Sequence, residues 1–142
     1  MRLNVYEVLE KIKSARTKEK KISLLKQNES WALKDILRGT FDSTIEWNLP
    51  GGEPPYTPAL ERSVPANLLN EHKNFMYFVK GLRESNRLTP VKRESMFIGL
   101  IEGIHPEDAK VVINMINKKK PHGLSRPMIE EAFPGLLLDS QL

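Results

Sequence analysis

The sequence predicts an all-α fold, a compact bundle of about seven short helices with one long central loop rich in proline and glycine. Apolar residues recur at helical spacing along most of the chain. Ser, Thr, Asn and Pro stand where helices would begin, and prolines and glycines gather near the middle. A length of 142 residues is typical of one domain. We expect that domain to span residues 1–136, followed by a flexible tail at 137–142.

Three helices are expected before the central loop. They follow Asn4, Thr17 and Ser30, whose side chains can accept the first free N–H groups of a helix. Gly39 suits the end of the third helix, since glycine takes the left-handed conformation common after helix ends. The apolar face of each helix is formed, in turn, by Val5, Val8, Leu9 and Ile12, by Ile22 and Leu25, and by Trp31, Leu33, Ile36 and Leu37.

The pattern changes after the third helix. Residues 41–49 contain an alternation of apolar and polar positions that predicts one short extended piece. Residues 50–58 are rich in proline and glycine. This segment indicates a loop within the domain, because neither flank is large enough to fold well alone.

Four further helices are expected after the loop. One covers residues 68–79. Pro90 and Pro106 each open another, since proline at the first helical position loses no hydrogen bond. Ser125 is expected to cap the last helix, which ends at Pro134.

The composition favours an anionic partner. Lys and Arg number 22 against 18 Asp and Glu, and the isoelectric point is about 9.3. Nucleic acid, an acidic protein or an anionic membrane would suit such a chain. The lack of cysteine excludes disulfides and thiolate metal sites. We expect neither a membrane span nor a secretory signal, because the apolar runs are short. The expected location is the cytoplasm, that of an infected host cell if the chain is phage-encoded.

Residues 118–126 combine three features that attract phosphate. The segment carries a formal charge of +4 without an acidic residue. Gly123 allows close backbone approach, and the helix expected after Ser125 offers unpaired N–H groups. Lysines also favour helix C-termini and simple solvation, but the adjoining helix start favours a phosphate site. The predicted DNA contacts are Lys118, Lys119, Lys120, His122, Gly123, Leu124, Ser125 and Arg126.

Two other groups of basic residues are candidates. Residues 1–28 hold eight Lys and Arg against three Glu, a charge of +5, which leaves the rest of the chain at −1. Charge polarised in this way is typical of a DNA footprint, although two highly charged surface helices would give the same pattern. A third group surrounds the helix start at Pro90, where solvation is an equally simple explanation. The candidates from the two groups are Lys18, Lys20, Lys21, Lys92 and Arg93.

The sequence contains no pattern for catalysis or metal binding. His72, His105 and His122 lie in different elements, and none has a His or Glu partner with zinc-site spacing. We expect His72 at the edge of the core and His105 at a helix entrance. Glycine-rich phosphate loops and the G-x-S-x-G motif are absent. We therefore expect no enzyme activity, no metal and no cofactor.

Aromatic side chains are a further means of binding nucleobases by stacking. Most of them occupy apolar positions and are expected in the core. The exceptions, near or in the proline-rich loop, are Trp47 and Tyr56.

Three stretches carry a resemblance to a known family. Residues 20–40 (KKISLLKQNESWALKDILRGT) form a lysine-rich pair of helices with an Arg-x-Thr end. Residues 109–119, followed by Gly123-Leu124-Ser125, form a helix, a basic turn and a new helix start, and residues 131–136 read EAFPGL. In this order they resemble the α-helical N-terminal DNA-binding domain of ATP-dependent DNA ligases of the T-even phage type. Small proteins of large tailed phages look similar.

That resemblance implies a grip on duplex DNA across the minor groove around a nick, mostly through phosphates. The ligase Lys-x-Asp-Gly motif is absent, and 142 residues leave no room for a nucleotidyltransferase domain or an OB-fold. The resemblance therefore implies binding without chemistry. The residues it implicates are Lys118, Lys119, Gly123, Leu124, Ser125, Arg38 and Thr40.

We therefore expect a non-enzymatic protein that binds double-stranded DNA, with or without a nick, as an accessory to phage replication or transcription. The alternative is an adaptor that docks on a polymerase, a sliding clamp or a host RNA polymerase. Its support is the tail at 136–142, which mixes leucines with an acidic residue as clamp-binding tails do. Packing of the leucines against the domain, followed by disorder, is the simpler explanation of that tail, and we prefer it.

Overall fold

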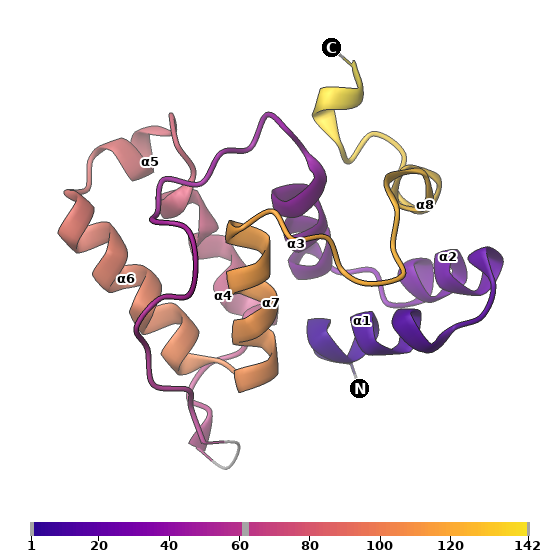
Figure 1. The fold of residues 1–142 in the computed structure, drawn as a ribbon, viewed down its shortest axis with the longest axis horizontal. Helices are drawn as coiled ribbons and strands as arrows, with labels where there is room; N and C mark the ends of the chain where they lie inside the picture. The colour runs from indigo at the N-terminus through magenta and orange to yellow at the C-terminus, as the bar shows by residue number, and fades with distance from the viewer. Residues whose placement is uncertain (1, 61–62, 142) are drawn as a thin grey trace.

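The computed structural model of the protein describes residues 2–60 and 63–141. Over these residues the fold is all-α, as predicted, with a loop across residues 42–67 (Figure 1). The eight α-helices described are α1 (Val5–Ser14), α2 (Lys18–Gln27), α3 (Trp31–Phe41), α4 (Leu68–Glu71), α5 (Arg83–Asn86), α6 (Pro90–Gly103), α7 (Pro106–Ile116) and α8 (Arg126–Ala132). The 3₁₀ segments η2 (His72–Phe78) and η3 (Leu138–Gln141) follow α4 and α8 respectively.

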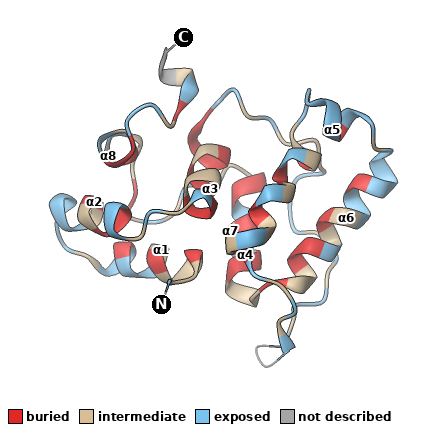
Figure 2. Ribbon diagram, turned by 180° about the vertical axis from the view of Figure 1, so that it is seen from behind, coloured by how far each residue is buried: buried red, intermediate tan, exposed pale blue. Residues whose placement is uncertain are grey.

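Helix α3 lies in the middle of the molecule. It packs against α7, α4 and η2, while α2 packs against both α1 and α8. Figures 1 and 2 show α2 and α8 toward one end of the long axis and α5 and α6 toward the other. Buried side chains of the helices form an apolar core, and Figure 2 shows the buried segments facing inward.

Side-chain caps begin several of the helices where the sequence predicted. The side-chain oxygens of Thr17, Ser30 and Thr89 each accept the backbone N–H three residues later at 3.1 Å. Before α1, the Glu7 carboxylate accepts the Asn4 N–H at 3.0 Å. Each bond satisfies a polar group that the end of a helix leaves unpaired.

The helix predicted over 68–79 is α-helical for only its first turn and continues as η2. The chain leaves the helix at Val79, which forms an isolated antiparallel bridge with Trp47. This bridge uses the short extended piece predicted within 41–49. The bridge comes directly after Phe78, where η2 ends.

Gly39 does not end α3, in contrast to the sequence prediction, because the helix continues to Phe41. A Cβ at Gly39 would lie 2.6 Å from the Trp47 indole and 2.7 Å from the Met115 sulfur. Glycine is therefore required by close packing. The missing side chain lets Trp47 and α7 approach the backbone of α3.

Within the flexible tail expected at 137–142, residues 137–139 contact the rest of the fold, and residue 142 lies outside the described residues. Leu137 is 1% exposed, and the Leu138 N–H donates to the Asp42 carboxylate at 2.9 Å. Asp139 bonds to Arg126. The sequence did not predict this anchoring because both partners are distant along the chain.

The histidines take the structural positions predicted for them. His72 is buried, and its Nδ1 lies 2.6 Å from the Asp35 carboxylate. His105 precedes α7, and its Nδ1 accepts the Glu107 N–H at 3.1 Å. Among residues 2–60 and 63–141, no helix has the length and apolar character needed to cross a membrane.

Replacing Gly39 by alanine is expected to destabilise the protein by about 1–3 kcal/mol, because the new methyl group would overpack the contact between α3 and α7. Gly99 is a matched control, since it is also helical but a Cβ there meets nothing within 4 Å. Gly99→Ala should be neutral or stabilising by up to about 1 kcal/mol. Urea unfolding of the two variants measures both effects, and equal stabilities would contradict the packing role of Gly39.

Asp108 links α1 to the start of α7 and should make stability pH-dependent. It is 1% exposed and accepts the Tyr6 N–H at 3.0 Å. Burial raises the pKa of its carboxyl from 3.8 to about 6, although the Tyr6 bond and the nearby His105 oppose the shift. The folded protein therefore keeps a proton that the unfolded chain releases at lower pH. The contribution of Asp108 to the free energy of unfolding falls as the pH rises from about 4 to about 6.

Asp108→Asn keeps an acceptor for the Tyr6 N–H and removes this titration. Relative to the variant, the wild-type protein should lose up to about 3 kcal/mol of stability between pH 4 and pH 7. Chemical unfolding of both proteins across this range measures the difference. A difference that does not change with pH would contradict the raised pKa.

Candidate nucleic-acid interface

The basic segment 118–126 forms a turn between α7 and α8. Lys118 and Gly123 adopt left-handed backbone conformations with φ of 56° and 86°, which turn the chain sharply. In Figure 1 the turn is the orange segment that leaves α7 and crosses toward α2 and α8.

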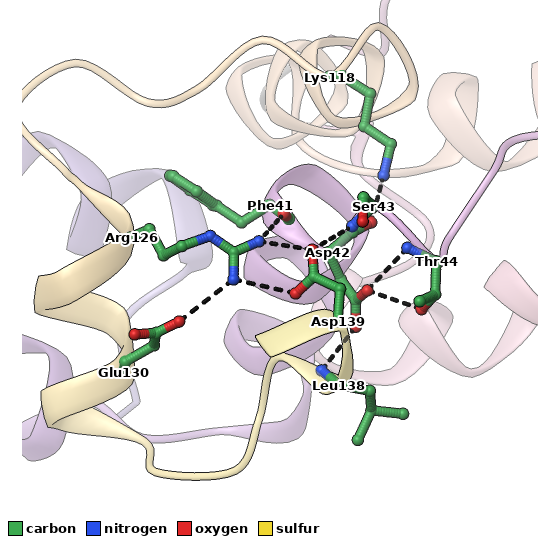
Figure 3. Close-up of polar contacts among 9 residues, drawn as sticks. All are labelled: Phe41, Asp42, Ser43, Thr44, Lys118, Arg126, Glu130, Leu138 and Asp139. Atoms are coloured by element: carbon green, nitrogen blue, oxygen red, sulfur yellow. Dashed lines mark hydrogen bonds and ion pairs between the residues drawn. The ribbon is translucent and has the colours of Figure 1, made fainter. Parts of the chain in front are cut away.

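Both ends of this turn are fixed to the C-terminal end of α3 (Figure 3). The Lys118 ammonium donates to the Asp42 carbonyl at 2.9 Å, and the Arg126 guanidinium donates to the Phe41 carbonyl at 2.6 Å. Carbonyls at a helix C-terminus lack partners within the helix and attract cations. The turn is therefore clamped at residues 118 and 126, and between them Lys119, Lys120 and His122 are exposed.

The C-terminal segment holds Arg126 from a second side. The Asp139 carboxylate accepts two bonds from the guanidinium, at 2.9 and 2.7 Å, and one from the Ser43 N–H at 2.8 Å. The Arg126 bonds and the Ser43 N–H hold the pKa of Asp139 well below its usual range. Glu130 adds a contact to Arg126 at 3.2 Å. Arg126 thus anchors the structure, which does not fit the phosphate contact predicted for it.

Asp42 connects the two clamps. Its carboxylate accepts the Thr44 hydroxyl at 2.6 Å, the Thr44 N–H at 2.9 Å and the Leu138 N–H at 2.9 Å. Burial raises the pKa of Asp42, but these bonds more than offset it, so the pKa is lower than usual. Partial burial lowers the pKa of the Lys118 ammonium, and attraction by Asp42 and Asp139 compensates only in part. Lys118 belongs to this anchor as well, and its role corrects the prediction of an open phosphate contact.

Gly123 brings the turn against the N-terminal helices. Its carbonyl accepts a bond from the Lys21 ammonium at 2.9 Å. A Cβ at Gly123 would lie 3.0 Å from that ammonium and 3.5 Å from the Lys13 Cα. The two basic segments of the sequence are therefore neighbours in space. Nothing in the sequence predicted that Lys13 lies beside the turn.

We define the basic face by five lysine side chains and the adjoining His122. Lys18 and Lys21 lie one turn apart on α2, and Lys21 is half-buried against the turn. The other members are exposed. The sequence segments that supply this face, 1–28 and 118–126, carry +5 and +4, and the whole chain carries +4, so the remaining residues carry −5. The members of the basic face are Lys13, Lys18, Lys21, Lys119, Lys120 and His122.

Other predicted contacts are buried or capped inside the protein. Thr40 is buried, and its hydroxyl donates to the Ile36 carbonyl at 2.8 Å. Arg93 is 7% exposed and donates to two carbonyls of residues 85 and 88 at 2.9 Å. Leu124 is 8% exposed. Burial does not fit a DNA contact, so we assign these side chains to the core and to loop anchoring.

The remaining predicted residues are separated from the basic face or contribute little to it. Lys20 lines a depression between α1 and α2 that also holds Glu7 and Glu10. Lys92 lies in the first turn of α6, and α6 lies toward the other end of the molecule from α2 and α8 (Figure 1). Ser125 precedes α8, as expected, but its side chain makes no cap bond. Because α8 has only seven residues, its peptide dipoles add little attraction for an anion.

The two tryptophans differ from their predicted positions. Trp47, a candidate for stacking on bases, packs against the core, whereas Trp31, expected in the core, is exposed. Trp47 packs against Phe75, with the ring centroids 6.1 Å apart, and its Nε1 donates to the Gly39 carbonyl at 3.0 Å. Tyr56 is half-buried against the core. In contrast, Trp31 is 66% exposed. It lines a depression with Arg38, which is a further predicted contact that lies apart from the turn.

In the part of the chain that the structure describes, no three His, Asp or Glu side chains come together as a metal site. The arrangement instead brings Lys13 and Lys21 to the turn that carries the exposed Lys119 and Lys120. Such a surface can bind an extended polyanion by electrostatic attraction.

Asp139→Ala should release the Ser43 N–H, because that donor then loses its carboxylate acceptor. Its hydrogen exchange is expected to accelerate roughly tenfold or more, in line with the loss of one charge-assisted hydrogen bond. Glu130→Ala is the control, since it removes a different carboxylate from Arg126 and leaves the Ser43 bond intact. Amide exchange measured by NMR distinguishes the variants. Unchanged exchange in Asp139→Ala would contradict the anchor.

Comparison with known proteins gives a family but no activity. No curated protein matches the chain significantly. Residues 8–121 match the model of a family of unknown function, DUF6433, from α1 to the basic turn. This match covers well over half of the 142 residues, so the chain belongs to the DUF6433 family.

Proposed function

We propose that this protein binds double-stranded DNA without acting on it, by placing the basic face against the phosphate backbone. The observation that carries this proposal is the bond from Lys21 to the Gly123 carbonyl, which joins residues 102 positions apart. Two basic segments thereby become one surface. A uniformly solvated protein would have no need for this concentration of charge.

The clamp at the end of α3 supports this use of the turn. Lys118 and Arg126 fix the turn before any ligand binds, so less conformational entropy is lost when Lys119 and Lys120 contact phosphates. If about five phosphates are neutralised, the logarithm of the binding constant should fall with the logarithm of salt concentration at a slope of about −4 to −5. Phosphate contacts position a protein without reading bases, so we expect little sequence preference.

The resemblance to the DNA-binding domain of phage-type ligases is consistent with this proposal. It suggests an accessory role in phage replication or transcription and makes nicked duplex a useful ligand to compare. The adaptor alternative has less support, because Leu137 is buried and Asp139 is bonded to Arg126. These two contacts occupy part of the tail, although Leu138 is 49% exposed.

The triple variant Lys18→Ala, Lys119→Ala, Lys120→Ala should weaken binding to duplexes of any sequence. Each lost phosphate contact should make the slope of the logarithm of the binding constant against the logarithm of salt concentration less steep by about 1. Fluorescence anisotropy with labelled duplexes over a salt series measures affinity and slope together. Unchanged affinity would contradict the assignment of the basic face as the DNA-binding surface.

A matched control removes the same number of charges at the far end of the molecule. Arg83, Arg87 and Lys92 are exposed around α5 and the start of α6. Their triple alanine variant should retain the wild-type slope. An equal loss in both variants would show a general effect of net charge and contradict a localised interface.

A further inference from the structure

A second surface feature lies between the start of α3 and the end of α8. It is a depression of about 390 Å³ whose walls include Trp31, Lys34 and Arg38 on one side and residues 132–136 on the other. Its volume falls in the range of pockets that bind small ligands. Its aromatic and cationic walls suit a ligand that is both planar and anionic.

Trp31 presents an open aromatic surface at this depression. It is 66% exposed, the largest side chain among the strongly exposed apolar residues described. The Lys34 ammonium lies 4.6 Å from the indole ring and 5.4 Å from the Phe133 ring, and it pairs with Glu29. Contact between this cation and the rings holds the indole in place. The exposed remainder of the indole is free to stack on another flat group.

Arg38 adds charge one helical turn beyond Lys34. Its guanidinium lies 3.7 Å from the Asp35 carboxylate, and that carboxylate also binds His72 at 2.6 Å. The Arg38 side chain is 37% exposed. A guanidinium has more N–H donors than this single long contact uses, so it can bind a phosphate.

The depression lies close to the basic face. Lys18 begins α2, and Glu29, which lines the depression, comes just after its end. A helix of this length spans about 15 Å, so the two features are only a few nucleotide spacings apart. A strand leaving a duplex bound on the basic face can therefore reach Trp31.

We propose that this depression binds an unpaired nucleotide next to the duplex, with its base stacked on Trp31 and its phosphate held by Arg38. This inference rests on the proposed DNA binding and narrows its ligand to duplexes with a single-stranded end or gap. Stacking on an aromatic side chain is tolerant of base identity, so the preference depends on strand structure and not on sequence.

The test compares a blunt duplex with the same duplex carrying a short single-stranded overhang. Wild-type protein should bind the overhang probe roughly tenfold more tightly, as one stacked base predicts. Trp31→Ala should remove this preference and keep the affinity for the blunt duplex, while Trp31→Phe should restore part of it. Val91→Ala removes another strongly exposed apolar side chain, 79% exposed on α6, and should change neither affinity.

Fluorescence provides a second measurement. In Trp47→Phe, with folding checked by circular dichroism, Trp31 is the remaining tryptophan, since the chain has two. The overhang probe should quench its emission and the blunt duplex should not. Arg38→Gln should make the salt slope for the overhang probe less steep by about 1.

The outcomes separate this inference from the proposed function. Equal affinity for both probes, or a preference that survives in Trp31→Ala, would overturn the inference while leaving duplex binding intact. A protein that binds neither probe would overturn both. Overhang binding that depends on Trp31 and keeps its full affinity when the basic face is neutralised would support the nucleotide site and refute the duplex interface.

Discussion

The attachment of the basic turn to the end of α3 determines where the protein can present its charge. The carbonyls of Phe41 and Asp42 bind Arg126 and Lys118, the two ends of the turn. Unpaired carbonyls at this helix end and the nearby carboxylates satisfy those cations inside the protein. The side chains of Lys119, Lys120 and His122 then remain exposed, and the Gly123 carbonyl contacts Lys21 of α2. One helix terminus thus divides a run of similar cations into anchors and exposed groups.

Local signals predicted the elements of this fold well. The caps at Thr17, Ser30 and Thr89 depend on neighbours three residues away, so their pattern is visible in the sequence. Gly39 was misinterpreted because its requirement comes from Trp47 and Met115, which are distant along the chain. The same limit explains why the bridge that follows η2 was not visible in the sequence. A bridge between residues 47 and 79 is a tertiary event.

The candidate site was predictable as a charged segment but not residue by residue. Lysine and arginine have the same pattern in a sequence whether they bind an external phosphate or an internal carbonyl. Arg93 illustrates the difference, since two carbonyls near it account for its burial. The two tryptophans show the same difference between internal and external contacts for aromatic residues. Trp47 fills the space left by Gly39, whereas Trp31 lies at a helix start with few neighbours to cover it.

The division of charge also limits how the protein can meet a polyanion. The segments that supply the basic face carry +9 together, and the remainder of the chain carries −5. Phosphates are attracted to the first group and repelled by the second, so the field of the whole molecule favours one orientation on approach. Because Asp139 neutralises Arg126, the attraction is concentrated on the part of the turn nearest α2. In the proposed complex, this orientation turns the part of the basic face nearest α2 toward the phosphate backbone.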